Sequence, residues 1–226
     1  MPKVQERKLA AIMFVDIVGY SRMMAFNEER TLRILKDFEN IGSSIVKEND
    51  GLIIKKIGDE LFCEFSSAKH AVDAALSIQN SLQSYNDSRS KDFKLQVRIG
   101  IHLGDIVKKD ADVFGDGVNV ASRISPFAAP GGICISNAVK DSISSHPHYN
   151  IKSEGQQELK NILEKHTLFR VETGFEDKIR LKNKIFKSSI LKYFGVALLI
   201  LFIIAGYYGY NIYNNYKILL NSDIDN

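Results

Sequence analysis

Two aspartate carboxylates could bind divalent cations if the fold brings them together. Asp16 interrupts the apolar run of residues 9–18 (LAAIMFVDIV), and Asp59 lies in the turn of KKIGDELF. Burying such a group costs free energy unless it is paired or binds a metal, and hard divalent cations prefer oxygen ligands. On adjacent strand ends the two carboxylates would converge on cations. Two simpler interpretations stay open: a basic side chain could pair with Asp16, and Gly58-Asp59 is also an ordinary hairpin turn.

A second pair of polar residues lies in DVFGDGVNVASR, residues 112–123. Asn119 and Arg123 are four positions apart, so both point to one side if the segment is helical. A guanidinium beside an amide suits a phosphate and a ribose, because its fixed donors hold oxyanions. The alternative is a capped surface helix with an exposed arginine, and spacing alone favours that alternative.

The apolar pattern predicts the elements that must position these side chains. Residues 9–18 read as a buried strand, and three-to-four spacing predicts helices over 28–49 and 67–85. Gly58-Asp59 between two β-rich runs predicts a hairpin. Further strands are expected at 52–57, 60–65, 93–101, 104–107, 132–135 and 167–171, and short helices at 118–125 and 137–145. This mixed order predicts an α+β fold with a central sheet.

Composition narrows the class of protein. The 226 residues are 45% apolar and 25% charged, which excludes a disordered chain. Residues 1–175 carry 23 basic and 23 acidic side chains. This balance argues against a nucleic-acid-binding surface, so no nucleic-acid partner is expected. Cys63 and Cys134 lie 71 positions apart in apolar runs, with no metal-binding spacing, which favours a reducing compartment.

A membrane span is expected near the end of the sequence. Residues 193–216 contain no charged side chain, and a helix of that length crosses a bilayer core of about 30 Å. A buried helix of a soluble protein is the alternative. Residues 176–192 carry six basic and two acidic side chains, and only Lys217 is basic beyond the span. The positive-inside rule then places the first 192 residues in the cytoplasm, as a single-pass membrane protein.

The expected organisation therefore has four parts. A folded domain covers residues 1–175, and a basic juxtamembrane linker covers 176–192. A transmembrane helix in contact with lipid covers 193–216, and a short extracytoplasmic tail covers 217–226.

Several motifs in one order resemble the catalytic domain of the class III nucleotidyl cyclases. They are FVDIVGYS, KKIGDELFCEF, VRIGIHLGDIV, DVFGDGVNVASRI, and later GGICIS with LKNI. The resemblance covers about residues 5–172. It implies a ferredoxin-like α+β domain with a central, mostly antiparallel sheet and flanking helices.

The resemblance also implies a role for each polar residue. Asp16, Asp59 and the backbone carbonyl of Ile17 would hold two divalent cations per site, Mg²⁺ or Mn²⁺. Lys55 and Asp112 would select the purine. Asn119 would orient the ribose, Arg123 would stabilise charge on the reacting phosphate, and Lys152 in IKSEG is a weaker match to a triphosphate-binding lysine, because the spacing toward Leu159 and Lys160 departs by about two residues.

Lysine and aspartate in the purine site favour adenine. An ammonium at position 55 can donate to a ring nitrogen of adenine, and a carboxylate at 112 can accept from its exocyclic amine, whereas guanine presents an oxygen and a protonated nitrogen there. The GTP-using relatives generally carry glutamate in place of Lys55. The expected reaction is therefore conversion of ATP to 3′,5′-cyclic AMP and pyrophosphate, by in-line attack of the ribose 3′-hydroxyl on the α-phosphate.

The resemblance further implies a homodimer with composite active sites, because the aspartates and the nucleotide-contacting residues of one site come from opposite subunits. Other functions remain open. They are a guanylate cyclase, a catalytically silent nucleotide-binding dimerisation module, and a tail-anchored interaction protein.

Overall fold

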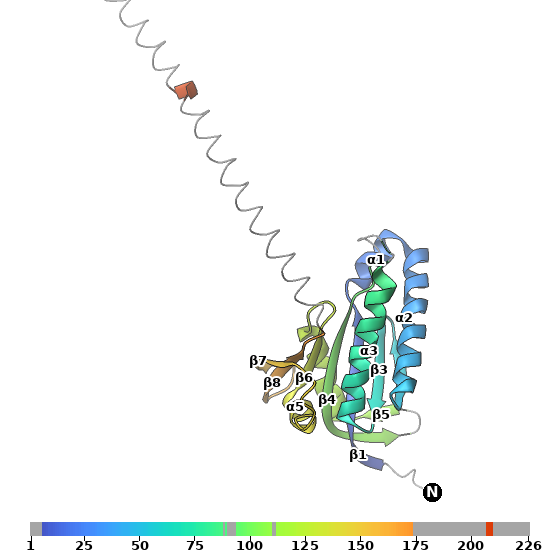
Figure 1. The fold of residues 1–226 in the computed structure, drawn as a ribbon, viewed down its shortest axis with the longest axis vertical. Coiled ribbons are helices and arrows are strands. Elements are labelled where there is room, and N and C mark those ends of the chain that lie inside the picture. The colour runs from blue at the N-terminus through green and yellow to red at the C-terminus, as the bar shows by residue number, and fades with distance from the viewer. Residues whose placement is uncertain (1–5, 88, 90–93, 110–111, 174–206, 210–226) are drawn as a thin grey trace, which may run out of the picture. The chain divides into compact units, whose positions relative to one another are not determined.

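The computed structural model describes residues 6–87, 89, 94–109, 112–173 and 207–209. Its first part is built from β1 (Glu6–Ile17), α1 (Tyr20–Phe26), α2 (Glu28–Glu48), β2 (Gly51–Ile57), β3 (Glu60–Phe65), α3 (Ala68–Asp87) and β4 (Val97–Lys109). The strands follow the order β2-β3-β1-β4, and all neighbours are antiparallel. The two units β1-α1-α2-β2 and β3-α3-β4 interleave in this strand order, which is the expected ferredoxin-like arrangement (Figure 1).

The second part extends the sheet beyond β4. Its elements are β5 (Asp112–Phe114), α4 (Asp116–Ile124), a 3₁₀ turn (Ser125–Phe127), β6 (Ile133–Ser136), α5 (Asn137–Ser142), β7 (Ile151–Glu158) and β8 (Lys165–Val171). The order continues as β4-β6-β8-β7, while β5 pairs with the end of β4. Among the described strands only β4 and β6 run parallel, so the sheet is mixed and mostly antiparallel.

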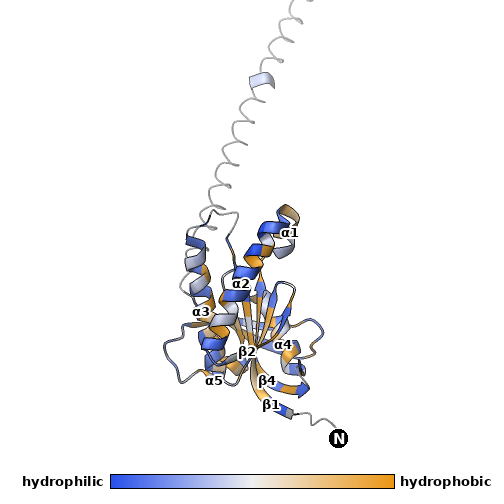
Figure 2. Ribbon diagram, turned by 90° about the vertical axis from the view of Figure 1, so that its right-hand side faces the viewer, coloured by the Kyte–Doolittle hydropathy of each residue, from blue (hydrophilic) through white to orange (hydrophobic). Residues whose placement is uncertain are grey.

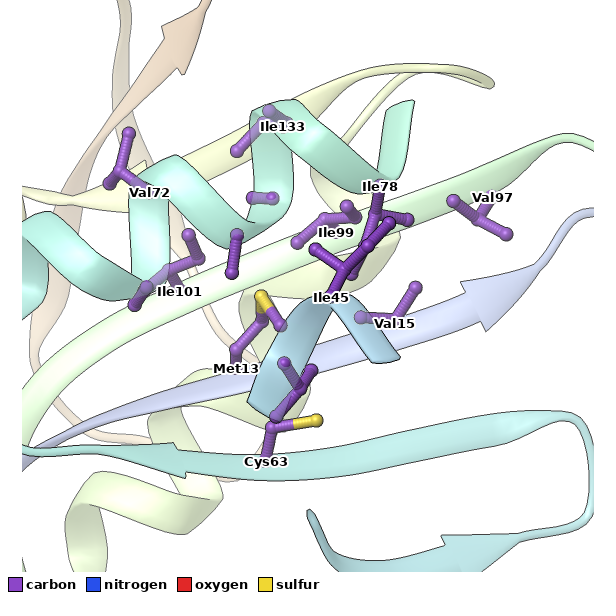
Figure 3. Packing of buried hydrophobic residues seen from close by; sticks show 14 of the residues in the cluster. Met13, Val15, Ile45, Cys63, Val72, Ile78, Val97, Ile99, Ile101 and Ile133 are labelled. Atoms are coloured by element: carbon purple, nitrogen blue, oxygen red, sulfur yellow. The ribbon is translucent and has the colours of Figure 1, made fainter. Parts of the chain in front are cut away.

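One face of the sheet carries the main core under α2 and α3. Both helices are amphipathic, with hydrophilic and hydrophobic residues interspersed along them (Figure 2). Ile45 of α2 and Ile78 of α3 point toward the odd-numbered side chains of β1 and β4, such as Val15 and Ile99 (Figure 3). Burying these side chains stabilises the fold by about 25 cal/mol per Å² of apolar surface.

The opposite face is covered by α4 and the 3₁₀ turn. Gly100 of β4 makes this packing possible, because a Cβ there would lie 2.3 Å from the backbone nitrogen of Ser125. The even-numbered residues of β1 and β3 point to this side, including Phe14 and Phe62, whose rings stack with centroids 4.8 Å apart. By register Asp16, Lys55 and Lys152 also belong to this side, which we call the α4 face, and α4 itself carries Asn119 and Arg123.

Most of the predicted elements are observed, with several differences. α1, β5 and β7 were not predicted. The strand predicted from residue 93 begins instead at Val97, because the backbone of Leu95 bonds to the side chain of Asn86 at the end of α3. The strand then runs without a break to Lys109 and includes the segment 104–107.

The expected transmembrane span lies outside the described residues, apart from 207–209, which are helical. In the part of the chain that the structure describes, no helix has the length and hydrophobicity needed to cross a membrane. The expected linker and tail also lie outside the described residues.

Candidate active site

Asp16 and Asp59 come together at one end of the sheet. Asp16 is the penultimate residue of β1, and Asp59 lies in the turn between β2 and β3, after Gly58 at φ +61°. The N–H of Ile17 donates to the carbonyl oxygen of Asp59 at 3.4 Å, which ties the two segments. Partial burial raises the pKa of Asp59, and the neighbouring Asp16 carboxylate raises it further. The sheet therefore brings both predicted metal ligands into one acidic site.

Two residues that the sequence did not single out complete this site. Asp16 is the register partner of Glu60 on β3 and of Arg98 on β4, so the three residues form a row across the α4 face. The guanidinium of Arg98 forms an ion pair with Asp16, with Nε 3.1 Å from Oδ2. Arg98 stands in an apolar strand, as Asp16 does, and this shared pattern is the signal that could have revealed it.

Glu60 lies in an unusual electrostatic environment. Burial raises the pKa of its carboxyl to about 7, and the charges of Asp16 and Asp59 contribute in the same direction. Arg98 and Arg123 oppose that shift. Adjacent carboxylates that repel each other fit a site for divalent cations, because a cation would relieve the repulsion.

The side chains of the acidic site alone do not supply a complete set of metal ligands. Among the described residues there is no group of three or more histidine, cysteine, aspartate or glutamate side chains that could hold a metal ion. The ion pair with Arg98 shows that a basic side chain does neutralise Asp16, as the simpler interpretation expected. Cations held by Asp16 and Asp59 would need further oxygen ligands, which backbone and phosphate oxygens supply.

Lys55 and Asp112 meet on the same face. Lys55 is on β2 after an irregularity in its pairing with β3, and Asp112 opens β5. Their side chains form an ion pair across 57 residues of sequence. Lys55 holds the pKa of Asp112 below its usual range, and the N–H of Val113 donates to Asp112 Oδ1 at 2.9 Å. The pair presents a donor and an acceptor side by side.

Asn119 and Arg123 lie on one side of α4, as their spacing predicted. Both are exposed, while Val120, Ala121 and Ile124 pack against the sheet. Figure 2 shows α4 close to β4. No hydrogen bond or ion pair joins Asn119 or Arg123 to the aspartates in the described part of the chain. Both side chains are therefore open to solvent, and Arg123 lies near enough to Glu60 to lower the pKa of that carboxyl.

Lys152 is far along the sheet from the acidic site. One register row runs from Lys55 through Phe62, Phe14, Gly100, Cys134 and Arg170 to Lys152. Lys55 and Lys152 thus lie at opposite ends of the α4 face. Between them, the C-terminal end of α4 packs against Gly100. Lys152 forms an ion pair with Glu172 of its own chain.

This fold, with an acidic site at the end of β1 and an Asn/Arg pair on α4, defines the class of protein. The model of the adenylate and guanylate cyclase catalytic domain matches residues 3–173. The chain therefore belongs to the family of adenylate and guanylate cyclase catalytic domains.

Similar proteins include cyclases from several bacteria. The chain is 38% identical over 157 residues to putative adenylate cyclase 3 of Rhizobium meliloti, covering 69% of this chain and 27% of that protein. It is 32% identical over 160 residues to an adenylate cyclase of Anabaena cylindrica, covering 62% of this chain and 32% of that protein. The chain thus spans about a third or less of the length of these relatives.

Solved structures share the fold. An adenylate/guanylate cyclase/hydrolase from Silicibacter pomeroyi is 34% identical, with a TM-score of 0.70 over 74% of this chain and 98% of that one. The adenylyl cyclase CyaB from P. aeruginosa is 22% identical, with a TM-score of 0.62 over 75% of this chain and 96% of that one, and supports the fold alone.

Proposed function

We propose that this protein is an adenylate cyclase that converts ATP to 3′,5′-cyclic AMP and pyrophosphate. The observation that carries the proposal is the convergence of Asp16 and Asp59 from separate segments on one acidic site. Carboxylates in such an arrangement suit divalent cations, which a transfer at an α-phosphate requires. The names of the two curated relatives described above, a putative adenylate cyclase and an adenylate cyclase, support the same activity.

Asp16, Asp59 and the carbonyl of Ile17 would hold two divalent cations, Mg²⁺ or Mn²⁺. When bound, such ions lower the pKa of a ribose 3′-hydroxyl and neutralise phosphate charge. The side chains of the protein orient the nucleotide and exclude other nucleotides. Phosphoryl transfer requires little covalent chemistry from them.

The order of residues on the α4 face supports the assigned roles. Lys55 and Asp112 lie at one end of the face, Asn119 and Arg123 on the helix in the middle, and Lys152 at the other end. ATP has the same order of parts: base, ribose and α-phosphate, then the β- and γ-phosphates. Arg123 supplies a fixed fork of donors for charge that develops on the phosphate, and Asn119 supplies a hydrogen bond to the ribose.

The Lys55–Asp112 pair favours adenine over guanine. Its ammonium donates where adenine has a ring nitrogen, and its carboxylate accepts from the exocyclic amine. Guanine reverses both positions, and each mismatch in a desolvated site costs about 1–3 kcal/mol. A guanylate cyclase is the second candidate, supported by relatives such as the receptor-type guanylate cyclase gcy-13 of Caenorhabditis elegans.

We also propose that the active unit is a homodimer with composite sites. Asn119 and Arg123 are exposed on α4 and form no hydrogen bond or ion pair with Asp16 or Asp59 in the described part of the same chain, so a second copy can reach them. A second copy related by a two-fold axis would place its Asn119 and Arg123 beside the aspartates of the first copy. By the same symmetry, Asn119 and Arg123 of the first copy would lie beside the aspartates of the second.

The test is incubation of the purified full-length protein with ATP and Mn²⁺, followed by detection of cyclic AMP and pyrophosphate. GTP in place of ATP is measured in parallel. We expect cyclic AMP from ATP and none from the Asp16→Ala variant. Preferential cyclic GMP formation would establish the guanylate cyclase, and nucleotide binding without any cyclic product would establish the silent dimerisation module.

Anchoring through residues 193–216 is a further part of the proposal. It is supported by 24 uncharged positions and by the basic side chains that precede them. The catalytic domain would then be cytoplasmic. A protease added outside intact cells should leave residues 1–175 uncut, and digestion of that domain would reverse the proposed topology.

A further inference from the structure

Glu60 lies directly beside the two aspartates of the acidic site. It is the first residue of β3, and its register partner on β1 is Asp16. Side chains of directly opposed residues in an antiparallel pair share one face of the sheet, with their Cβ atoms about 4.5–5.5 Å apart. Because β1 lies between β3 and β4, Glu60 is on one side of Asp16 and Arg98 is on the other. The half-buried carboxylate of Glu60 therefore belongs to the α4 face at the acidic site.

The positive charge at this site does not balance the carboxylates. Arg98 forms an ion pair with Asp16. The carboxylate of Glu60 forms no hydrogen bond or ion pair with any residue that the structure describes. Arg123 acts on Glu60 only through its charge, and its effect is weaker than that of Arg98. Three carboxylates, those of Asp16, Asp59 and Glu60, thus share one guanidinium in direct contact.

An unpaired carboxylate beside two others destabilises a fold. Like charges repel each other, and partial burial removes the water that would screen them. The charges of Asp16 and Asp59 do act on Glu60 in this unfavourable direction. A divalent cation beside the three carboxylates would reverse the balance, because each carboxylate would then attract it. The cost of placing Glu60 here is therefore recovered only when a cation is bound.

We propose that Glu60 is a positioning residue of the cation site, whose negative charge holds hydrated divalent cations beside Asp16 and Asp59 before the nucleotide binds. This inference rests on the proposed cyclase function, and within it on the assignment of Asp16 and Asp59 as cation ligands. It adds to that assignment a third carboxylate that sets the affinity of the nucleotide-free protein for Mg²⁺ or Mn²⁺.

Glu60 acts through its charge and not as a third direct ligand. The described residues contain no group of three acidic, histidine or cysteine side chains that could hold a metal ion directly. Mg²⁺ usually keeps several of its waters and is bound through one or two carboxylates. A further carboxylate close by can accept hydrogen bonds from such waters, as groups outside the direct ligands of a metal commonly do.

The experiment measures binding of Mn²⁺ to the purified full-length protein without nucleotide. The free ion is followed by its electron paramagnetic resonance signal at about pH 8, where the Glu60 carboxyl is mostly ionised. Glu60→Gln removes the charge at nearly constant shape, Glu60→Asp keeps it, and Asp16→Ala removes a proposed ligand. Urea unfolding in the presence of a chelator measures the stability of each metal-free variant.

Glu64→Gln is the matched control. Glu64 is on the same strand and the same face, but its register partner on β1 is Ile12, about 13 Å along the strand from Asp16. Its carboxylate is paired with Lys8, so the variant loses the same charge without touching the acidic site.

We expect Glu60→Gln to weaken Mn²⁺ binding about five- to tenfold, and Asp16→Ala to weaken it further. The effect of Glu60→Gln should shrink at high salt. Glu60→Asp should stay within about twofold of wild type, and Glu64→Gln should bind Mn²⁺ as wild type does. Without metal, Glu60→Gln should be at least as stable as wild type, because a repulsive charge is gone, whereas Glu64→Gln should be less stable.

Several results would overturn the inference and leave the cyclase function intact. Equal Mn²⁺ affinity in wild type and Glu60→Gln would mean that the third carboxylate contributes nothing, and equal weakening in Glu64→Gln would mean that only total charge matters. A Glu60→Asp protein as weak as Glu60→Gln would exclude an action through charge.

Lower stability of metal-free Glu60→Gln would indicate a merely structural role. If Glu60→Gln does not fold, Glu60→Ala removes the same charge. A wild type that forms cyclic AMP but binds no Mn²⁺ without nucleotide would also refute the inference alone. Absence of both cyclic nucleotide formation and Mn²⁺ binding in the wild type would instead refute the proposed function.

Discussion

The carboxylate of Asp16 and the guanidinium of Arg98 form an ion pair between neighbouring strands, although 82 residues separate them in the chain. The same carboxylate faces Glu60 on its other side and lies close enough to Asp59 to raise the pKa of that residue. Asp16 is therefore the centre of the acidic site, with one basic and two acidic neighbours.

Replacing Asp16 should separate activity from stability. Asp16→Ala removes a proposed metal ligand, so we expect cyclic AMP formation to fall by more than about a hundredfold. Its ion pair is partly exposed, so the free energy of unfolding should change by about 1 kcal/mol or less. Activity assays and urea unfolding of the same preparation measure both quantities. Retained activity in a folded Asp16→Ala protein would remove the basis of the proposed metal site.

Lys55 should control the choice of purine. Lys55→Glu places a carboxylate beside Asp112 and removes the donor to adenine, so the ratio of kcat/KM for ATP to that for GTP should fall at least about tenfold. Lys56→Ala is the control, because Lys56 pairs with Glu39 at 2.6 Å and does not contact Asp112. An unchanged ratio in Lys55→Glu would mean that other groups select the base.

Mixed variants should reveal composite sites. Chains with Asp59→Ala and chains with Arg123→Ala are each expected to be inactive. A heterodimer of the two contains one intact site, so an equal mixture should recover about a quarter of the wild-type activity by random pairing. The assay requires proof that dimers form and exchange. Inactive mixtures that contain heterodimers would favour a site built within one chain.

Gly100 should be sensitive to a single methyl group. In Gly100→Ala the new Cβ would lie 2.3 Å from the Ser125 nitrogen and 2.6 Å from its Cα, so the turn after α4 must shift. We expect a loss of about 1–3 kcal/mol in the free energy of unfolding. We also expect a fall in kcat, because α4 carries Asn119 and Arg123. If Gly100→Ala keeps the stability and kcat of the wild type, the turn after α4 can shift to accommodate the methyl group.

His102 should make stability depend on pH. Its imidazole is largely buried beside Ser136, with Nδ1 2.9 Å from Oγ, and burial lowers the pKa to about 4 from 6.5, helped by His166. The unfolded chain therefore binds the proton first as pH falls, and stability is lost between about pH 6.5 and pH 4. Between about pH 7.5 and pH 5 this single group should cost about 2 kcal/mol.

The measurement is urea unfolding of wild type and His102→Gln at both pH values. The variant lacks the imidazole, so its unfolding free energy should change less between them, while other titrating groups affect both proteins alike. Equal pH dependence in the two proteins would mean that His102 is not buried in its neutral form.

The sequence by itself determined most of the elements and the identity of the polar residues. Three-to-four spacing predicted α2 and α3, the apolar run with a carboxylate predicted β1, and Gly58-Asp59 predicted the hairpin, because these signals are local. The spacing of Asn119 and Arg123 likewise placed both on one side of a helix before the helix was seen.

Only the tertiary structure decided which distant residues meet. Strand register set Arg98 and Glu60 beside Asp16, and pairing of β7 with β8 brought Glu172 to Lys152. The strands β5 and β7 were missed because their conformation depends on hydrogen bonds to β4 and β8 rather than on their own apolar pattern. Cross-strand partners depend on sheet order and register, which no local periodicity encodes.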